Sequence, residues 1–449
     1  MLSVKNKKLL CVVSGVLGVI MLGIIITVCV LFIPLNGSAY EYVWSGPSAA
    51  YDITKDSVVV EKNLDKEDFT IVQLTDMQLW SSGKDNNAAF DTAEEVIKRT
   101  DPDLVVFTGD NVSGVGVPEL LKTFIKKIEA LASKYDFLWA PVFGNHDNEM
   151  RATPNWSGDQ YLKVSREKGG HCLFQKGPTN LGDEYGDLLG NYVINVKEGN
   201  QIVQSLYMLD NSAYAKYSKD LINSVFEKEG RKSKERPFPY AQIEWCKWQA
   251  TNINKIAGDT VPSIFFTHCA PYEMGDVVLK YVAGGNGKID GQKSDNSNSD
   301  DLDKEIVGKN SFWTIPGSNI PNSGGGPVIK PASVKNNNAI NYPIIDGKEL
   351  KGILGRISYV PGHALYNTGI VDAMKDLGLK GWFVGHDHEN DCVFEYDGVV
   401  YGYGLKAGPS PKPWNDSFFF GGTKIVMDKS GNIKPTHIIT TTSESYWKK

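Results

Sequence analysis

The chain has 449 residues, of which 41% are hydrophobic and 22% are charged, so it is long and apolar enough to bury a large core. Its net charge is -6 and its isoelectric point is near 5.7. The apolar fraction excludes disorder of the chain in bulk. The acidic balance, with no long basic block beyond the N-terminus, argues against a nucleic-acid-binding surface, so we expect no nucleic-acid partner.

A basic segment and a long apolar run open the chain. Residues 9–33 carry no charge and are long enough to cross a bilayer as a helix, and three lysines lie in residues 1–8 before them. The positive-inside rule therefore predicts a cytoplasmic segment 1–8, a single-pass anchor 9–33 and an extracytoplasmic remainder. The alternative is a signal peptide cleaved after the small residues 37–39, which would make the protein secreted.

Residues 34–66 are expected to form a stalk leading into a first strand at 58–60, ahead of one domain over 67–449. A regular alternation of strands and helices opens this domain. Apolar, β-branched runs predict strands over 69–74, 104–108 and 137–143, and helical periodicity predicts helices over 88–99 and 118–135. This βαβαβ order predicts a largely parallel sheet, in which ligands bind beyond the carboxyl ends of the strands.

The second half of the domain is less regular. Two runs, 192–196 and 202–209, predict a hairpin that turns near Gly199. A long segment rich in Gly, Asn, Ser and Asp, about 273–356, is interpreted as an irregular insertion. The remaining expected elements are helices over 240–256 and 368–377, and strands over 263–267, 381–384, 393–396, 399–403 and 423–427.

Four cysteines lie beyond the apolar run, at Cys172, Cys246, Cys269 and Cys392. Their wide spacing is not that of a disulfide framework, and we expect one bridge or none, with the pairing open. Cys269 and Cys392 form the first pair to test, because each lies near a candidate site residue.

Polar residues follow five of the predicted strands, and a glycine accompanies three of these ends, at Gly109, Gly144 and Gly385. Two of the intervals, from position 76 to 110 and from 110 to 145, are 34 and 35 residues long, the length of one βα repeat. The polar residues at the strand ends are Asp76, Gln78, Asp110, Asn145, His146, Asp147, His268, His386 and His388.

The pair His386 and His388 lies two residues apart directly after a strand, so an extended backbone would point both rings to the same side. Neutral imidazoles bind zinc, iron or manganese, and carboxylates offset the charge of such cations. Together with the other strand-end groups, the pair predicts a metal site at the carboxyl edge of the sheet.

These strand-end blocks resemble the calcineurin-like metallophosphoesterase superfamily, whose blocks D-x-H, G-D-x-x, G-N-H-[DE], a lone H and G-H-x-H have counterparts here in that order over about 69–403, four of the five matching closely. The segments Tyr-Asn-Thr-Gly at 366–369 and Gly-His-Asp-His-Glu-Asn-Asp at 385–391 resemble the purple-acid-phosphatase-like branch. The resemblance implies a four-layer αββα sandwich of two mixed sheets. This domain would follow the predicted N-terminal transmembrane helix in the chain.

The resemblance also implies a site that holds two metal ions from among Mn, Fe, Zn and Mg. Asp110 would bridge both ions. Asp76 and His388 would complete one shell, and Asn145, His268 and His386 the other. His146 would donate a proton or hydrogen bond to the leaving oxygen, with Asp147 orienting it, and Asn145 and His363 would contact the substrate.

Gln78 departs from the family pattern, because the first block usually ends in histidine. In related purple phosphatases a tyrosine three residues after the bridging aspartate completes this shell, whereas here that position is Ser113. A glutamine carbonyl ligates a hard cation but is a weaker donor to zinc or iron than imidazole. We therefore expect a protein without the tyrosinate-to-iron colour.

The predicted function is hydrolysis of phosphate esters, with monoesters favoured over diesters and a metal-activated water as nucleophile. The substrate would be a phosphorylated small molecule, lipid or protein, selected by the segments 150–190 and 273–356. The alternative is a membrane-tethered binding protein on the same fold, in which Gln78 impairs the first metal position and turnover is small.

Overall fold

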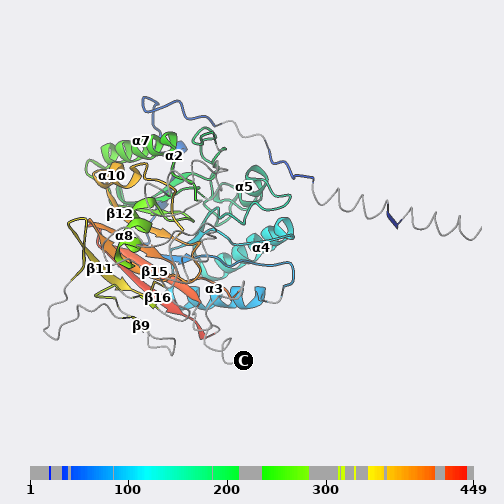
Figure 1. Ribbon diagram of the computed structural model, residues 1–449. Helices are drawn as coiled ribbons and strands as arrows, with labels where there is room; N and C mark the ends of the chain where they lie inside the picture. The colour runs from blue at the N-terminus through cyan, green and yellow to red at the C-terminus, as the bar shows by residue number, and fades with distance from the viewer. Residues whose placement is uncertain are drawn as a thin grey trace, which may run out of the picture.

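The protein was analysed as a computed structural model (Figure 1), which describes residues 20–21, 33–38, 42–83, 85–184, 186–211, 235–282, 312–313, 315–318, 328–329, 342–357, 362–409 and 420–441. Among these residues no helix combines the length and the apolar character needed to cross a bilayer. The predicted cytoplasmic segment 1–8 and nearly all of the predicted anchor 9–33 lie outside the described residues.

The smaller sheet has five strands in the order β16-β15-β2-β3-β4. The parallel strands are β2 (Thr70–Leu74), β3 (Leu104–Thr108) and β4 (Leu138–Val142), as the βαβαβ pattern predicts. The antiparallel strands are β15 (Gly421–Met427), which was predicted as 423–427, and β16 (Ile433–Ile439), which was not predicted.

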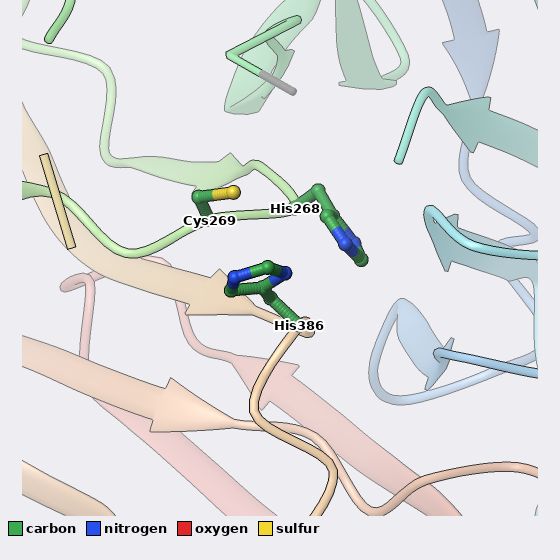
Figure 2. Close-up of side chains that lie close together, drawn as sticks. All are labelled: His268, Cys269 and His386. Carbon is green, nitrogen blue, oxygen red and sulfur yellow. The ribbon is translucent and has the colours of Figure 1, made fainter. Parts of the chain in front are cut away.

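The larger sheet is mixed and has nine strands in the order β1-β5-β6-β7-β12-β14-β13-β11-β10. Its parallel neighbours β7 and β12 end side by side and bring His268 and His386 together, with ring centroids 5.1 Å apart (Figure 2). The strands are β1 (Val58–Glu61), β5 (Tyr192–Glu198), β6 (Gln201–Met208), β7 (Ser263–Phe266), β10 (Ile344–Ile345), β11 (Lys348–Leu354), β12 (Leu379–Val384), β13 (Val393–Tyr396) and β14 (Val399–Tyr403).

Helices cover the outer face of each sheet. Figure 1 shows α3 (Asn86–Thr100) and α4 (Val117–Tyr135) on one side of the molecule, and α7 (Tyr240–Ala257), α8 (Tyr272–Val282) and α10 (Ile370–Lys375) on the other. The remaining described elements are α2 (Ile53–Asp56), α5 (Pro154–Leu162), the 3-10 turn η1 (Arg166–Lys168), and the paired strands β8 (Phe312–Trp313) and β9 (Val328–Ile329).

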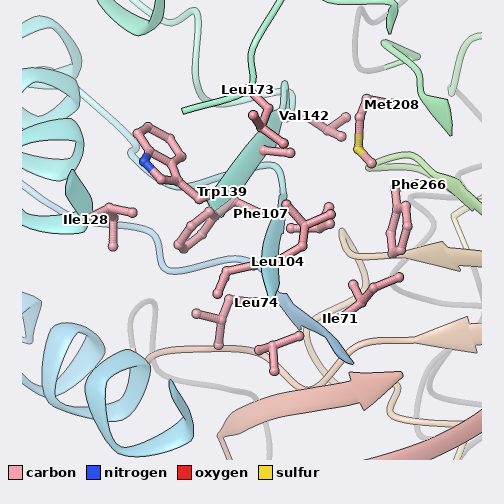
Figure 3. Packing of buried hydrophobic residues seen from close by; sticks show 14 of the residues in the cluster. Ile71, Leu74, Leu104, Phe107, Ile128, Trp139, Val142, Leu173, Met208 and Phe266 are labelled. Atoms are coloured by element: carbon pink, nitrogen blue, oxygen red, sulfur yellow. The ribbon is translucent and has the colours of Figure 1, made fainter. Parts of the chain in front are cut away.

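Alternation along the central strands produces the layering. In β6 and β7, Leu206, Met208 and Phe266 belong to the core shared with the five-stranded sheet, whereas Tyr207 and Phe265 pack in the core under the outer helices. Figure 3 shows Met208 and Phe266 beside the side chains of β2, β3 and β4. Because side chains of a strand alternate between its faces, each central strand serves both cores, and the four-layer αββα expectation fits this arrangement.

The segment 34–66 does not stand away from the domain as a stalk, so this part of the prediction was wrong for the described residues. Strand β1 pairs in parallel with β5, and Trp44 is buried in the core under the outer helices. Tyr51 lies edge-on to Trp248, with ring centroids 5.0 Å apart. Burial of these aromatic rings gives the segment a hydrophobic reason to dock.

Both ends of the expected insertion 273–356 are regular. Helix α8 opens it, and the β10–β11 hairpin closes it by pairing with β13. Its polar composition hid the apolar spacing Met274, Val277, Val278 and Tyr281, which faces the core under the outer helices. The four cysteines beyond the apolar run are buried free thiols, in agreement with the expectation of one bridge or none.

Glu273, in the first turn of α8, generates a pH-dependent prediction. Burial raises the pKa of its carboxyl to about 7, and Oε1 has no hydrogen-bond partner. A raised folded-state pKa adds stability that is complete below the unfolded pKa and is lost as pH rises through about 7. Glu273→Gln should therefore gain stability relative to the wild type, on the order of 1 kcal/mol, at pH 8 but not at pH 4.

Thermal unfolding at the two pH values measures this difference. Glu119→Gln, at a side chain 80% exposed on α4, is the matched control and should show no such pH dependence. An equal gain for Glu273→Gln at both pH values would contradict the assignment.

Candidate metal centre

The strand-end loops adopt backbone conformations that few residues accept. Asp76, Asp110 and His386 have φ angles of 53°, 51° and 72°. A left-handed conformation at a non-glycine residue costs on the order of 1 kcal/mol, and such strain clusters at functional sites. Here it turns each chain sharply at the sheet edge, so the side chains point into one space.

Glycines let these loops approach one another. A Cβ at Gly144 would lie 2.1 Å from Asp110 Oδ1, and a Cβ at Gly385 would lie 2.0 Å from Thr75 Oγ1 and 2.6 Å from Asp76 Oδ2. At Gly109, where φ is 89°, it would lie 2.7 Å from both Gly144 and the His268 ring. The site is therefore assembled by backbone contacts that only glycine permits.

One set of donors surrounds the Asn145 amide. Its Oδ1 lies 2.9 Å from His268 Nε2 and 3.0 Å from His386 Nδ1. His268 Nε2 is also 3.3 Å from Asp110 Oδ2, while His268 Nδ1 donates to the Thr108 carbonyl at 2.8 Å. That backbone bond orients the ring so that Nε2 faces Asn145 and Asp110, where it would bind a cation after losing its proton.

A second set surrounds Asp76. His388 Nε2 lies 3.2 Å from Asp76 Oδ1, and the Gln78 amide nitrogen lies 3.0 Å from His388 Nε2 and 3.3 Å from Asp110 Oδ2. Rotating the Gln78 amide by 180° would place its oxygen where its nitrogen now lies, because the amide has nearly the same shape in both orientations. Gln78 thus occupies a position from which its side chain could ligate, although its role as a ligand stays a prediction.

Two groups of potential ligand atoms converge, and both contain His268. Asp76, Asp110 and His268 offer atoms within 4.8 Å of one another, and so do His268, Cys269 and His386. Figure 2 shows the last three side chains at the ends of β7 and β12. Cys269 was not predicted as a ligand; burial raises the pKa of its thiol well above the usual value, so the metal-free site holds it neutral.

Charge within the site is balanced by the histidines. Burial alone would raise the pKa values of Asp76 and Asp110, but His388 and His268 reverse this and lower the pKa values of both carboxyls. Burial opposes protonation of His268, yet Asp110 raises the pKa of its ring to about 10. His268 therefore holds a proton in the metal-free centre, which cation uptake would release, whereas burial lowers the pKa of His388.

Asp147 connects two of the loops. It is fully buried, and its carboxylate accepts hydrogen bonds from the backbone N–H groups of Asp110, Asn111, Val112 and Gly144, at 2.9, 2.9, 3.2 and 2.8 Å. These bonds fasten the turn after β3 to the turn after β4. They give Asp147 a structural task, and its predicted catalytic role stays untested.

The His146 side chain is 34% exposed and marks the solvent-exposed side of the site, which we call its mouth. Its Nε2 is 3.8 Å from Asp110 Oδ2, and its Nδ1 is 2.7 Å from Glu149 Oε1. The second Glu149 oxygen accepts a hydrogen bond from Gly114 N at 2.6 Å. The carboxylate in contact with His146 Nδ1 is therefore that of Glu149, which was not predicted.

His363 is near the site, but its ring faces elsewhere. It is buried, its Nδ1 donates to the Ala364 carbonyl at 2.7 Å, and the ring lies edge-on to Tyr272. A Cβ at Gly275 of α8 would lie 2.3 Å from this ring, so the ring fills the space beside the helix. These contacts favour a packing role, and its substrate contact stays a prediction.

Two further residues that were not predicted reach the site. Lys406 is buried and donates to the Asp76 carbonyl at 2.7 Å, and burial lowers the pKa of its ammonium to about 8. Glu235 Oε1 lies 3.3 Å from His386 Nε2. Lys406 follows the predicted strand 399–403 by three residues, so strand-end position could have pointed to it, whereas Glu235 follows no predicted strand closely.

The donor set fits a pair of metal ions. Asp76 Oδ1 is buried without a hydrogen bond, and His388 Nε2 lies 3.2 Å from it. Ring nitrogens and side-chain oxygens face one another across the centre, as ligands do around cations. The residues that would hold the metals are Asp76, Asp110, Asn145, His268, His386 and His388, with Gln78 beside them.

Comparisons with known proteins agree with this chemistry. A family model described as calcineurin-like phosphoesterase matches residues 69–290. A probable inactive purple acid phosphatase 29 from Arabidopsis thaliana is 34% identical over 127 residues, which are 27% of this chain and 31% of that protein. Phosphatase DCR2 from Saccharomyces cerevisiae is 31% identical over 130 residues, 28% of this chain and 21% of that protein.

A solved dimetal phosphatase from Danio rerio covers 80% of this chain and 92% of its own, at 12% identity and a TM-score of 0.38. The matches to the two curated relatives span about a third and a fifth of their lengths. The two sheets and the carboxylate–histidine centre define a metallophosphoesterase-type protein. The chain is thus similar to the calcineurin-like phosphoesterases over residues 69–290, and one of its relatives is named a probable inactive purple acid phosphatase.

Gly144→Ala should weaken metal binding, because the new Cβ would displace the Asp110 carboxylate. We expect a loss of affinity of about 10- to 100-fold, the range seen when the groups around a metal ligand are disturbed. Calorimetric titration of the metal-free protein with Zn²⁺ or Mn²⁺ measures it. Gly258→Ala, at the exposed end of α7 where a Cβ meets nothing within 4 Å, is the control and should bind metal normally.

Glu149→Ala should leave His146 without its partner at Nδ1, whereas Glu149→Gln keeps an acceptor there. If His146 assists the leaving oxygen, the loss in kcat for Glu149→Ala should be about tenfold or more with poor leaving groups and small with activated aryl phosphates. Glu149→Gln should retain most of the rate. A loss that is equal for all leaving groups would assign Glu149 a merely structural role.

Proposed function

We propose that this protein is a metal-dependent phosphoric ester hydrolase that acts on phosphomonoesters in preference to diesters. The observation that carries the proposal is the buried convergence of Asp76, Asp110 and His268, whose ligand atoms lie within 4.8 Å of one another. Beside it, His146 opens to solvent. The match to the calcineurin-like phosphoesterase family model supports the same reaction class.

The chain's own residues divide the work. Asp110, with Asp76 and the three histidines, would hold the cations, and bound cations would activate water, align the phosphoryl oxygens and neutralise their charge. The Asn145 amide contacts His268 and His386, and Asn145 directly precedes His146 in the chain. It would contact both a cation and a substrate oxygen.

His146 is placed to act on the leaving oxygen. Glu149 occupies Nδ1, so the ring presents Nε2 to the side of the site where Asp110 lies. A neutral ring protonated at Nδ1 would position the substrate through Nε2, and a doubly protonated ring would donate a proton to the departing alkoxide. In both states Glu149 fixes the direction of the ring.

The alternative is a binding protein with little turnover. Two features favour it: Gln78 and the buried Ser113 stand where the family usually has stronger ligands, and one relative is named as probably inactive. Two other features favour catalysis. Asp147 is fully buried and holds the turns after β3 and β4 together. His146 is open to solvent, and a pure binding site does not need a group directed at the leaving oxygen.

The place of action that we propose is outside the cytoplasm, with residues 9–33 as a single-pass anchor. The support is the uncharged run itself and the lysines before it. The domain would then meet phosphorylated substrates on the far side of the membrane.

Hydrolysis of 4-nitrophenyl phosphate by the full chain, loaded with Mn²⁺, Zn²⁺, Fe²⁺ or Mg²⁺, tests the activity. We expect a metal-dependent rate that chelation abolishes and that His146→Ala reduces by about 100-fold or more, the contribution typical of a general acid. His437→Ala is the control, because that ring bonds the Asp391 carbonyl and Thr423 away from the donor set. Absence of a metal-dependent rate with every cation would favour the binding protein.

A further inference from the structure

The end of the predicted membrane segment is fastened to the domain. Leu35 N donates to the Arg151 carbonyl at 2.7 Å, and Arg151 Nε donates to the Ile33 carbonyl at 3.0 Å. Thr153 Oγ1 donates to the Leu35 carbonyl at 2.8 Å. The chain that would leave the bilayer at Ile33 is therefore held against residues 151–153 and is not free to swing.

The fastening point adjoins the mouth of the metal centre. Arg151 lies two residues after Glu149, the partner of His146, in the loop between β4 and α5. Backbone bonds from Glu149 N to His146 O, 3.2 Å, and from Ala152 N to Glu149 O, 3.1 Å, make this stretch a tight turn. The distance along the chain from the fastening to the catalytic mouth is thus only a few residues.

Exposed apolar side chains flank the same mouth. Met150, next to Glu149, is 45% exposed and has a φ of 57°, a strained conformation that holds its side chain outward. Val115 is 62% exposed and follows Gly114, whose N–H bonds the other Glu149 oxygen. Ile33 is 56% exposed at the fastening itself. Three of the exposed large hydrophobic residues thus gather around one edge.

Groups suited to the bilayer interface lie beside them. Trp156 is partly exposed at the start of α5, next to Gly37, and Lys122 of α4 lies 5.7 Å from its ring centroid. Tryptophan and basic side chains concentrate at headgroup level, where apolar and charged surroundings meet. This edge therefore combines exposed apolar side chains, the Trp156 indole and the basic side chains of Lys122 and Arg151, as surfaces that lie at a bilayer interface do.

We propose that this edge, Ile33, Val115, Met150, Arg151 and Trp156, rests on the bilayer that the chain is anchored in, and that the substrate is the phosphomonoester headgroup of a lipid in that bilayer. The inference rests on the proposed hydrolase function and on the anchor. The headgroup would enter past His146, while the apolar part of the lipid stays in the membrane against Met150 and Val115. Water would take up the phosphoryl group, and the lipid alcohol would leave with a proton.

The test uses the full chain reconstituted in phosphatidylcholine vesicles that contain phosphatidate. Release of phosphate from phosphatidate is compared with hydrolysis of soluble 4-nitrophenyl phosphate and of a phosphoserine peptide. We expect phosphatidate to be preferred, and the ratio of lipid to soluble rate to fall about tenfold or more in Met150→Glu and Val115→Glu. Leu64→Glu is the matched control, because Leu64 is 70% exposed near Lys66, which bonds the Asp101 carbonyl at the opposite end of β3, and it should keep the ratio.

A binding measurement keeps the inference independent of turnover. Brominated phosphatidylcholine should quench the fluorescence of Trp156, taken as the difference between wild type and Trp156→Phe. Unchanged ratios in Met150→Glu and Val115→Glu, faster hydrolysis of the phosphopeptide, or no quenching of Trp156 would overturn the membrane-facing site. Loss of hydrolysis of every substrate with Trp156 still quenched would instead overturn the hydrolase function.

Discussion

The Asp147 carboxylate is the constraint on which the centre depends. Its four backbone hydrogen bonds hold the turns after β3 and β4 in one geometry. Asp110 lies in the first of these turns, and Asn145 and His146 lie in the second. Burying a carboxylate costs free energy unless hydrogen bonds replace the lost contacts with water, and these four bonds supply that replacement. The ligands are therefore positioned before any cation arrives, which lowers the cost of binding one.

The two halves of the centre differ in how firmly they are built. Around Asn145 two imidazoles converge, and one of them is locked by the Thr108 carbonyl. Around Asp76 the corresponding position belongs to the Gln78 amide, and the buried Ser113 contributes no aromatic oxygen. Harder cations, which accept neutral oxygen donors, suit this second half better than soft ones do. The two positions should then select different metals.

Periodicity and strand-end position predicted most of the fold and most of the side chains that converge at the sheet edge, because parallel strands bring their carboxyl ends to one edge whatever their separation in sequence. Asp110 and Asn145 are therefore visible in the sequence. Glu149 and Glu235 reach the centre from a turn and a loop whose paths depend on tertiary packing, which no local pattern encodes. Lys406 follows the predicted strand 399–403 but is a buried lysine, a residue type that is seldom buried and was not predicted there. Strand β11 and helix α8 were hidden for a related reason, since a polar insertion surrounds them.

The neighbours of β2 in its sheet have a consequence for how the protein folds. Strand β15 pairs with β2 although about 350 residues separate them in the chain, as the partners Thr423 and Gln73 show. Until residues 421–439 have been synthesised, β2 is an unpaired sheet edge, and the turn that carries Asp76 has support on one side only. Closing so long a loop is slow. The metal centre thus gains its full support only after β15 has been made, and a chain cut short before β15 would expose an aggregation-prone strand.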